Sequence, residues 1–134
     1  MQKVELNRKE TAQPPALKTP SGLNTIDASE ISLALNGLVA DAFTLYVKTK
    51  NFHWHMSGPH FRDYHLLFDE QADQIFASID PLAERVRKIG ETTLRSVGHI
   101  SKLSQLKGNE KEFVSPAQMV KELIDDNRAM AESM

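Results

Sequence analysis

Two pairs of side chains that could bind metal lie on one predicted helix of this chain. His65 and Asp69 are one helical turn apart, and so are Asp80 and Glu84. Asp69 and Asp80 are eleven positions apart in this helical pattern, which places the two pairs roughly 16 Å apart at about 1.5 Å per residue. Because bonds to metal ions are only about 2 Å long, one protomer cannot bring both pairs to one ion. Either the pairs are unrelated surface residues, or a second copy of the chain brings them together.

One symmetric arrangement would join the two pairs. If two copies of this helix pack antiparallel across a two-fold axis, the numbers of facing residues have a constant sum. The residue numbers of His65 and Glu84 have the same sum as those of Asp69 and Asp80. One register therefore brings both pairs together, and the two-fold symmetry forms each contact twice. At about 100° per residue, the three acids lie roughly 40°, 60° and 100° around the helix from His65. The apolar stripe lies on another face and consists of Phe61, Tyr64, Phe68, Ile75, Ile79, Leu82 and Val86.

The same residues also have ordinary structural explanations. Two acids one turn apart usually form a solvated helix face, and Glu84 could pair with Lys88 for about 0.2–0.5 kcal/mol. His65 could make a surface hydrogen bond to Asp69. These explanations would all have to hold at once, so we favour metal binding.

The elements that must position these residues are amphipathic helices. The first long helix is predicted to begin at Asp27, with Glu30 in an acidic variant of the capping box, and to run to about His55. The second is predicted to run from just after Pro59 to Gly90, a residue suited to a C-terminal cap. It continues through a proline at position 81, which would remove one hydrogen bond and kink the helix.

Two further helices are predicted in the second half of the chain. A short one lies within residues 96–106, where apolar residues recur every third position. A long one begins with Ser115 as N-cap and Pro116 at the first helical position. It is expected to turn four apolar side chains inward: Met119, Val120, Leu123 and Ile124.

The predicted elements make an all-α protein, since no strand pattern or internal repeat is present. Three long helices and a short one leave a four-helix bundle incomplete, because its core needs another apolar face. We therefore expect the fourth helix to be missing from this chain and to come from outside it. The alternative is that the chain is an inactive fragment, truncated at its C-terminus.

Composition restricts the function further. The chain has 134 residues, 40% of them hydrophobic and 25% charged, with a net charge of −2, as expected for one soluble domain. The absence of cysteine excludes disulfides and thiolate-bound metal. No secretory signal and no stretch of ~20 apolar residues is evident, so we expect a cytoplasmic protein that does not enter membranes.

Residues 1–22 are predicted to be a flexible, basic arm that precedes a helical domain at 23–134. Three prolines punctuate this segment, which is otherwise polar. Its cations could contact DNA phosphates, weakly for one arm and more strongly for many arms on one assembly. A plain disordered tail is the alternative. The candidate DNA-binding residues are Lys3, Arg8, Lys9 and Lys18.

Four segments together resemble the Dps family of miniferritins: 50–54 (KNFHW), 57–61 (SGPHF), 65–69 (HLLFD) and 80–90 (DPLAERVRKIG). The resemblance covers about residues 25–134 and includes the intervals between the motifs. It implies a ferritin-like four-helix bundle with a short helix in the middle connection. It also implies assembly through two-fold dimers into hollow dodecamers that oxidise Fe(II), preferentially with hydrogen peroxide, and store ferric mineral. Many family members bind DNA without sequence preference, so the resemblance also predicts nucleoid association, protection of DNA and a role in stress response.

The resemblance assigns roles to individual residues. It makes His53, together with His65 and Asp69, the ligands from one subunit. It makes the other two acids, Asp80 and Glu84, ligands from the two-fold mate at a di-iron site. Trp54 corresponds to the family's tryptophan beside the site and would be an auxiliary electron donor. Both His53 and Trp54 have simpler explanations, as a residue favoured by the helix dipole and as a core or interface residue.

Imidazole and carboxylate ligands suit redox-active Fe(II), and zinc could occupy the same site as an inhibitor. The Glu-x-x-His pair of ordinary ferritin centres is absent, which disfavours a site inside a single bundle. The sequence departs from the family at His55, where asparagine is common. His55 could add a ligand or be a solvent-exposed imidazole.

Overall fold

The computed structural model describes residues 14–134, and within them every regular element is a helix. A short 3-10 helix, η1 (Pro15–Leu17), precedes α1 (Thr25–Trp54) and α2 (Phe61–Lys88). The connection after α2 carries the short helix α3 (Val97–Leu103), and the last helix is α4 (Pro116–Glu132). The predicted all-α class, the three long helices and the short helix in the middle connection are confirmed.

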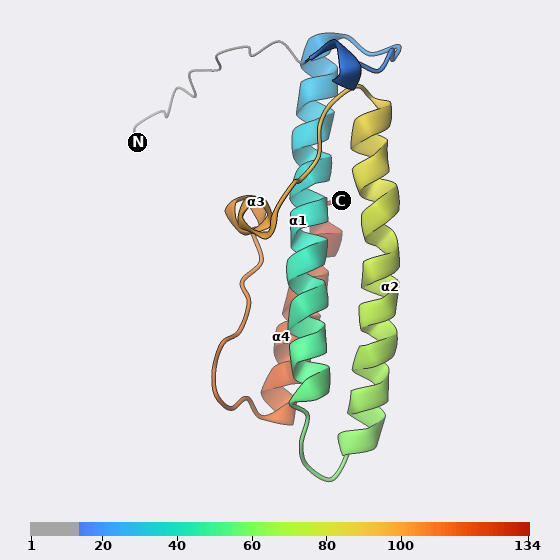
Figure 1. The fold of residues 1–134 in the computed structure, drawn as a ribbon. Helices are drawn as coiled ribbons and strands as arrows, with labels where there is room; N and C mark the ends of the chain where they lie inside the picture. The colour runs from blue at the N-terminus through green and yellow to red at the C-terminus, as the bar shows by residue number, and fades with distance from the viewer. Residues whose placement is uncertain (1–13) are drawn as a thin grey trace, which may run out of the picture.

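Helix α1 lies at the centre of the arrangement. It packs against α2, α3 and α4, whereas these three helices make no comparable backbone contacts with one another in the described chain. Figure 1 shows α2 running antiparallel beside α1, with α4 behind α1 and the connection with α3 on the other side. The residues of the candidate site lie on α1 and α2, so the pairing of these two helices positions it.

The ends of the helices agree with the predictions except at the start of α1. The N-cap of α1 is Asn24, whose side chain accepts from the backbone N–H of Asp27 at 2.9 Å. The predicted start at Asp27 with Glu30 is therefore wrong by about one turn. The N-cap of α4 is Ser115, which accepts from the N–H of Gln118 at 3.2 Å as predicted.

Gly90 ends α2 in a conformation that favours glycine. Its φ is +91°, in the left-handed region, and a Cβ there would meet the backbone oxygen of Thr19 at 2.8 Å. Arg87 also donates to the backbone oxygen of Leu17 at 3.0 Å. Part of the predicted arm, in the described residues 14–22, therefore contacts the end of α2.

The core forms between α1 and its neighbours in two clusters. One joins all three long helices and contains Phe52 of α1, Phe68 of α2 and Met119 of α4. The other, formed by Val39, Ala42 and Ile79, lies between α1 and the second half of α2. Ile124 was expected to point inward but is 50% exposed. It lies on the outer side of α4, whereas its neighbour Leu123 is buried.

Polar side chains of α1 hold the connection and α4 in place. Buried Asp41 accepts from the backbone N–H groups of Gln105 and Leu106 at 2.7 and 3.2 Å. Buried Lys48 donates to the backbone oxygen of Lys107 at 3.1 Å and lies 2.7 Å from the carboxylate of Asp126. These bonds supply the charged groups of a long apolar helix with partners.

The expectation that no segment is apolar enough to span a membrane needs correction. By length and composition alone, α1 is such a segment, with a mean hydropathy of 1.3 over its most apolar stretch. Its buried Asp41 and Lys48 bond to other parts of the domain, and its sides pack against three helices. These contacts favour the interpretation of α1 as a core helix of the domain. Core helices can be as long and as apolar as helices that span a membrane.

Candidate metal centre

Two histidines meet where the end of α1 faces the start of α2. Nδ1 of His53 donates to the backbone oxygen of His65 at 2.6 Å, and Nδ1 of His65 donates to that of His53 at 2.8 Å. Because a carbonyl oxygen only accepts, both rings carry their proton on Nδ1 and present Nε2 for other partners. The rings stack with centroids 3.8 Å apart. Such bonds are typical of the groups that orient metal-binding histidines.

The carboxylate of Asp69 completes the part of the site within one protomer. Its Oδ1 lies 3.7 Å from Nε2 of His53. The structure therefore places His53 next to both His65 and Asp69, and the role of the three residues as metal ligands stays a prediction. Phe61 stacks on the outer side of His65, with centroids 4.9 Å apart. This contact further restricts the orientation of that imidazole.

A lysine that we did not anticipate also lies at this site. Nζ of Lys50 contacts Oδ1 of Asp69 at 2.6 Å. The hydrogen bond from Lys50 is the main reason that the pKa of Asp69 lies below its ordinary value, and the nearby charges of both histidines lower it further. The same bond raises the pKa of Lys50. Asp69 is therefore ionised and available as a metal ligand at neutral pH.

These ligands do not close around a metal ion within one protomer. In residues 14–134, no group of three or more histidines and acids has the geometry of a metal site. Two imidazole nitrogens and one carboxylate form an open half-site, which suits Fe(II) or Zn²⁺ if more carboxylates are added.

The two remaining predicted ligands lie further along α2. Asp80 and Glu84 are both exposed, one turn apart, on the half of the helix remote from His65. The alternative pairing of Glu84 with Lys88 is not found among the ion pairs of the described chain. Meanwhile Phe68, Ile79 and Val86 are buried. The acids thus lie on a different face of α2 from the core, as the spacing predicted.

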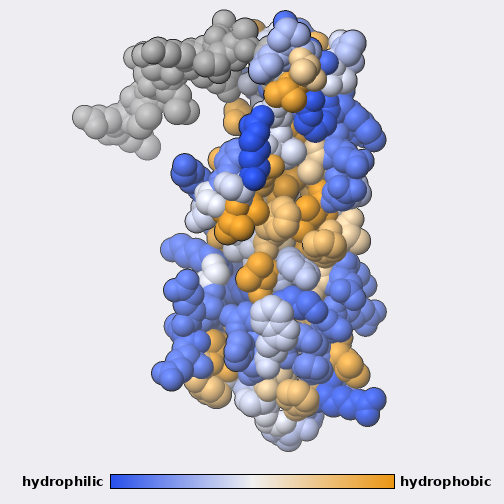
Figure 2. Space-filling model, in the orientation of Figure 1, coloured by the Kyte–Doolittle hydropathy of each residue, from blue (hydrophilic) through white to orange (hydrophobic). Residues whose placement is uncertain are grey.

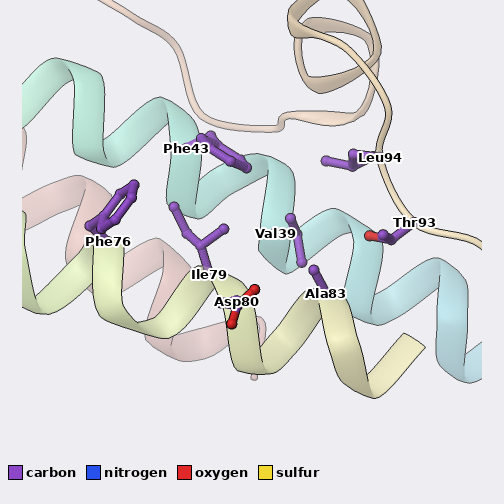
Figure 3. Close-up of a pocket in the computed structure, with 8 residues that line it drawn as sticks. All are labelled: Val39, Phe43, Phe76, Ile79, Asp80, Ala83, Thr93 and Leu94. Atoms are coloured by element: carbon purple, nitrogen blue, oxygen red, sulfur yellow. The ribbon is translucent and has the colours of Figure 1, made fainter. Parts of the chain in front are cut away.

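Asp80 borders an apolar groove of about 300 Å³. Figure 3 shows that the groove is lined from α1, from α2 and from the connection after α2. Figure 2 shows apolar side chains gathered over α1 and α2 in this part of the molecule. Asp80 is the one charged residue of the lining; the others are Val39, Phe43, Phe76, Ile79, Ala83, Thr93 and Leu94.

The other predicted functional residues are placed as follows. Trp54 is 63% exposed at the end of α1, next in sequence to His53, so it is not a core residue. His55 is exposed and donates from Nδ1 to Asn51, which leaves its role as a ligand untested. Of the candidate DNA-binding cations, Lys18 is exposed. The other three lie outside the described residues: Lys3, Arg8 and Lys9.

Sequence reasoning missed Lys50 and the reciprocal histidine bonds. Lys50 precedes His53 by three residues, a spacing that places both on one side of α1. That spacing was a usable signal. The bonds between His53 and His65 depend on the approach of two helices, which spacing along one helix does not reveal.

Comparison with known proteins supports this interpretation of the fold. The ferritin-like domain family matches residues 32–134. The DNA protection during starvation protein of Brevibacillus brevis is 36% identical over 99 residues, covering 72% of this chain and 64% of that protein. An uncharacterized low temperature-induced protein of Nostoc sp. is 35% identical over 100 residues, covering 75% of this chain and 56% of that protein. The chain thus spans somewhat more than half the length of these relatives.

Solved structures narrow the family. A Dps protein from Bacillus brevis has a TM-score of 0.78 and 31% identity, covering 83% of this chain and 74% of that one. Dps from Vibrio cholerae, described as a member of a superfamily of ferritin-like diiron-carboxylate proteins, has a TM-score of 0.79 and 26% identity. The similarity covers 87% of this chain and 73% of the Vibrio cholerae chain. The chain therefore belongs to the Dps family of ferritin-like proteins.

Proposed function

We propose that this protein binds Fe(II) between two copies of the chain, oxidises it with hydrogen peroxide and stores the ferric product. The observation that supports this most directly is the open half-site formed by His53, His65 and Asp69. Its histidines are oriented for metal, and its acid is ionised. Membership of the Dps family and the diiron-carboxylate description of the Vibrio cholerae relative point to iron as the substrate.

The second copy would supply the acids. In the antiparallel register derived from the sequence, Asp80 of a second copy faces Asp69, and Glu84 of that copy faces His65. The same register places Leu66 of one copy opposite Ala83 of the other, at the apolar groove. Leu66 is 52% exposed, as an interface residue would be in a single protomer. Both the acids and the groove are thus accounted for by one arrangement.

The chemistry follows from two ferrous ions at one site. Each gives one electron to the same peroxide, whose O–O bond breaks, and two protons complete two molecules of water. Because both electrons are delivered together, hydroxyl radical is not released. The chain's residues hold the ions: imidazoles from one copy, carboxylates from both, with Glu84 as the proposed bridge. Exposed Trp54 would donate an electron when only one ion is oxidised.

The wider role is part of the same proposal. Dimers built in this way would assemble into a hollow dodecamer that holds the mineral, in the cytoplasm and near the nucleoid. Removing Fe(II) and peroxide together would protect DNA during stress, which fits the name of the Brevibacillus brevis relative. Direct DNA binding stays a prediction, and with it the alternative of a nucleoid structural protein in which iron oxidation is secondary.

Complementation between two mutants tests the shared site. His65→Ala and Asp80→Ala should each abolish fast Fe(II) oxidation by peroxide, followed by the absorbance of the ferric product. In mixed assemblies, about one quarter of the sites would combine an intact His65 half with an intact Asp80 half. Activity should therefore recover to about a quarter of the unmutated value.

Asp125→Ala is the control, because Asp125 is an exposed acid on α4, outside the proposed interface, and has no proposed ligand role. It should oxidise iron at the unmutated rate. Mass measurement must show that mixed assemblies formed. Absence of recovery in such assemblies would place the whole site within one subunit and contradict the proposal.

A further inference from the structure

Two arginines of α2 lie on the helix face that carries the proposed ligands. At about 100° per residue, Arg62 and Arg87 lie roughly 60° and 40° around the helix from His65, within the range covered by the three acids. Arg62 precedes His65 by three residues, and Arg87 follows Glu84 by three residues. Each arginine is therefore about one turn beyond a proposed ligand, toward an end of α2.

The register that joins the proposed ligands also joins these two arginines. The residue numbers of Arg62 and Arg87 have the same sum as those of His65 and Glu84. In the antiparallel pair, Arg62 of one copy therefore faces Arg87 of the second copy, and the two-fold symmetry forms this contact at both ends of the interface. Two facing cations repel each other, so this arrangement calls for a negative charge between them.

Neither arginine has an acidic partner in the part of the chain that the structure describes. The ion pairs of residues 14–134 do not include Arg62 or Arg87. The side chain of Arg62 is exposed and makes no hydrogen bond to any of these residues. Glu84, one turn before Arg87, is assigned to iron in the proposed function. The negative charge therefore has to come from a ligand.

Arg87 is already oriented within one protomer. Its Nη1 donates to the backbone oxygen of Glu91 at 2.6 Å, and its Nη2 donates to that of Leu17 at 3.0 Å. These carbonyl groups are neutral, so they fix the guanidinium group without cancelling its charge. A guanidinium group has five N–H donors, so three remain for a ligand. Its planar arrangement of donors matches two oxygens of a phosphate group.

We propose that Arg62 of one copy and Arg87 of the second copy bind a phosphate-like oxyanion at each end of the interface. This inference rests on the proposed function, because it uses the same register and lies one turn from the proposed iron site. The two-fold symmetry gives two such sites per dimer, which is one per protomer. The bound anion cancels the repulsion between the guanidinium groups and thereby stabilises the pair of copies.

Calorimetric titration of the metal-free, assembled protein with inorganic phosphate tests the site without iron chemistry. One phosphate should bind per protomer, and chloride at the same ionic strength should not replace it, which separates binding from general screening. Arg62→Gln should weaken phosphate binding about tenfold or more, because it removes charged hydrogen bonds to the anion. Arg128→Gln, at an exposed arginine of α4, is the matched control and should bind phosphate as the unmutated protein does.

A charge reversal tests whether the two arginines face each other. Arg62→Glu would place a carboxylate opposite Arg87 of the second copy. In phosphate-free buffer, the assembly of this variant should resist dissociation by denaturant better than the unmutated assembly, and added phosphate should no longer stabilise it. Adding Arg87→Met to Arg62→Glu should remove the gain, since the interaction needs both residues.

Absence of phosphate binding, or equal binding by Arg62→Gln and the unmutated protein, would overturn the proposal. So would a less stable assembly of Arg62→Glu, since that would show that Arg62 pairs with an acid. Displacement of the phosphate by a short single-stranded oligonucleotide would identify the ligand as a phosphodiester, and its absence would identify the free anion; both results retain the site. If phosphate binds as expected while mixtures of His65→Ala and Asp80→Ala stay inactive, the proposed iron chemistry fails and this site remains. The reverse result removes this site alone.

Discussion

At the scale of single residues, the site is organised by hydrogen bonds that the ligands make away from the metal position. His53 and His65 each give their Nδ1 proton to the other's backbone, and Lys50 holds Asp69. The side chains of the proposed ligands are therefore already oriented in the protein without metal. Pre-oriented ligands lose less conformational entropy when they bind.

The pKa of Asp69 provides a direct test of the lysine contact. Lys50→Met should raise the pKa of Asp69 toward its ordinary value of 3.8, measured by NMR titration of the carboxyl carbon. Lys121→Met should leave Asp69 unchanged and raise the pKa of Asp125 instead. An unchanged Asp69 in Lys50→Met would show that the contact is absent in solution.

The sign of the linked stability effect follows from this shift. A carboxyl group whose pKa is lowered by folding stabilises the protein above its ordinary pKa, and this stabilisation is lost as the pH falls through the lower folded value. The difference in unfolding free energy between the unmutated protein and Lys50→Met should therefore shrink below about pH 4.

At this scale, the sequence could predict part of the site. The spacing of His65, Asp69, Asp80 and Glu84 separated the proposed ligands from core residues, because helical periodicity converts spacing into direction. Periodicity says nothing about a contact between two helices. The lysine contact and the reciprocal imidazole bonds depend on how α1 and α2 approach each other, so they required the structure.

At the scale of elements, α2 has two faces with different roles. The face toward α1 carries Phe68, Ile79 and Val86 and is buried, whereas the face with Asp80 and Glu84 remains open. The helix continues through Pro81 without interruption. It ends at Gly90, where the chain turns and passes close to Thr19.

Replacing Gly90 should destabilise the protein. Gly90→Ala combines a left-handed φ with a Cβ only 2.8 Å from the Thr19 oxygen, so we expect a loss of about 1–3 kcal/mol in unfolding free energy. Gly37→Ala, in α1 with open space around its Cβ, should stabilise by about 0.5–1 kcal/mol. Denaturant unfolding measures both. Equal effects of the two substitutions would contradict the role of Gly90.

Helix ends show why the sequence predicts some boundaries better than others. Ser115 followed by proline, and a glycine after a basic last turn, each offer one clear signal. At the start of α1, Asn24 and Asp27 were both suitable caps. Asn24 caps the helix, and its amide donates to the Asp27 carboxylate at 2.7 Å, so Asp27 occupies the third helical position. The true start is one turn earlier than predicted.

At the scale of the whole molecule, one protomer leaves an apolar groove and an acidic helix face open on the same side of α2. The all-α class and the order of helices could be predicted from periodicity. The groove could not, because residues of the connection after α2 contribute to it. The exposure of Ile124 was not predicted for a similar reason. Which side chains of α4 are exposed depends on which helices lie beside it.

A charge at the proposed interface should separate the two copies. Leu66→Glu would place a carboxylate opposite the groove and close to the acids, so we expect dissociation into smaller species and loss of iron oxidation. Mass measurement in solution follows the first effect. Ile124→Glu is the control, because Ile124 is also about half exposed but lies on α4. Unchanged assembly of Leu66→Glu would exclude the proposed register.

The turn between α1 and α2 has a consequence for how the chain folds. His53 and His65 are twelve positions apart, and their helices form an antiparallel hairpin. Closing so short a loop costs little chain entropy, whereas α4 must return from a point far along the chain to reach α1. We therefore expect the paired imidazoles to form early, so that a nascent protein holds its half of the proposed iron site before its core is complete.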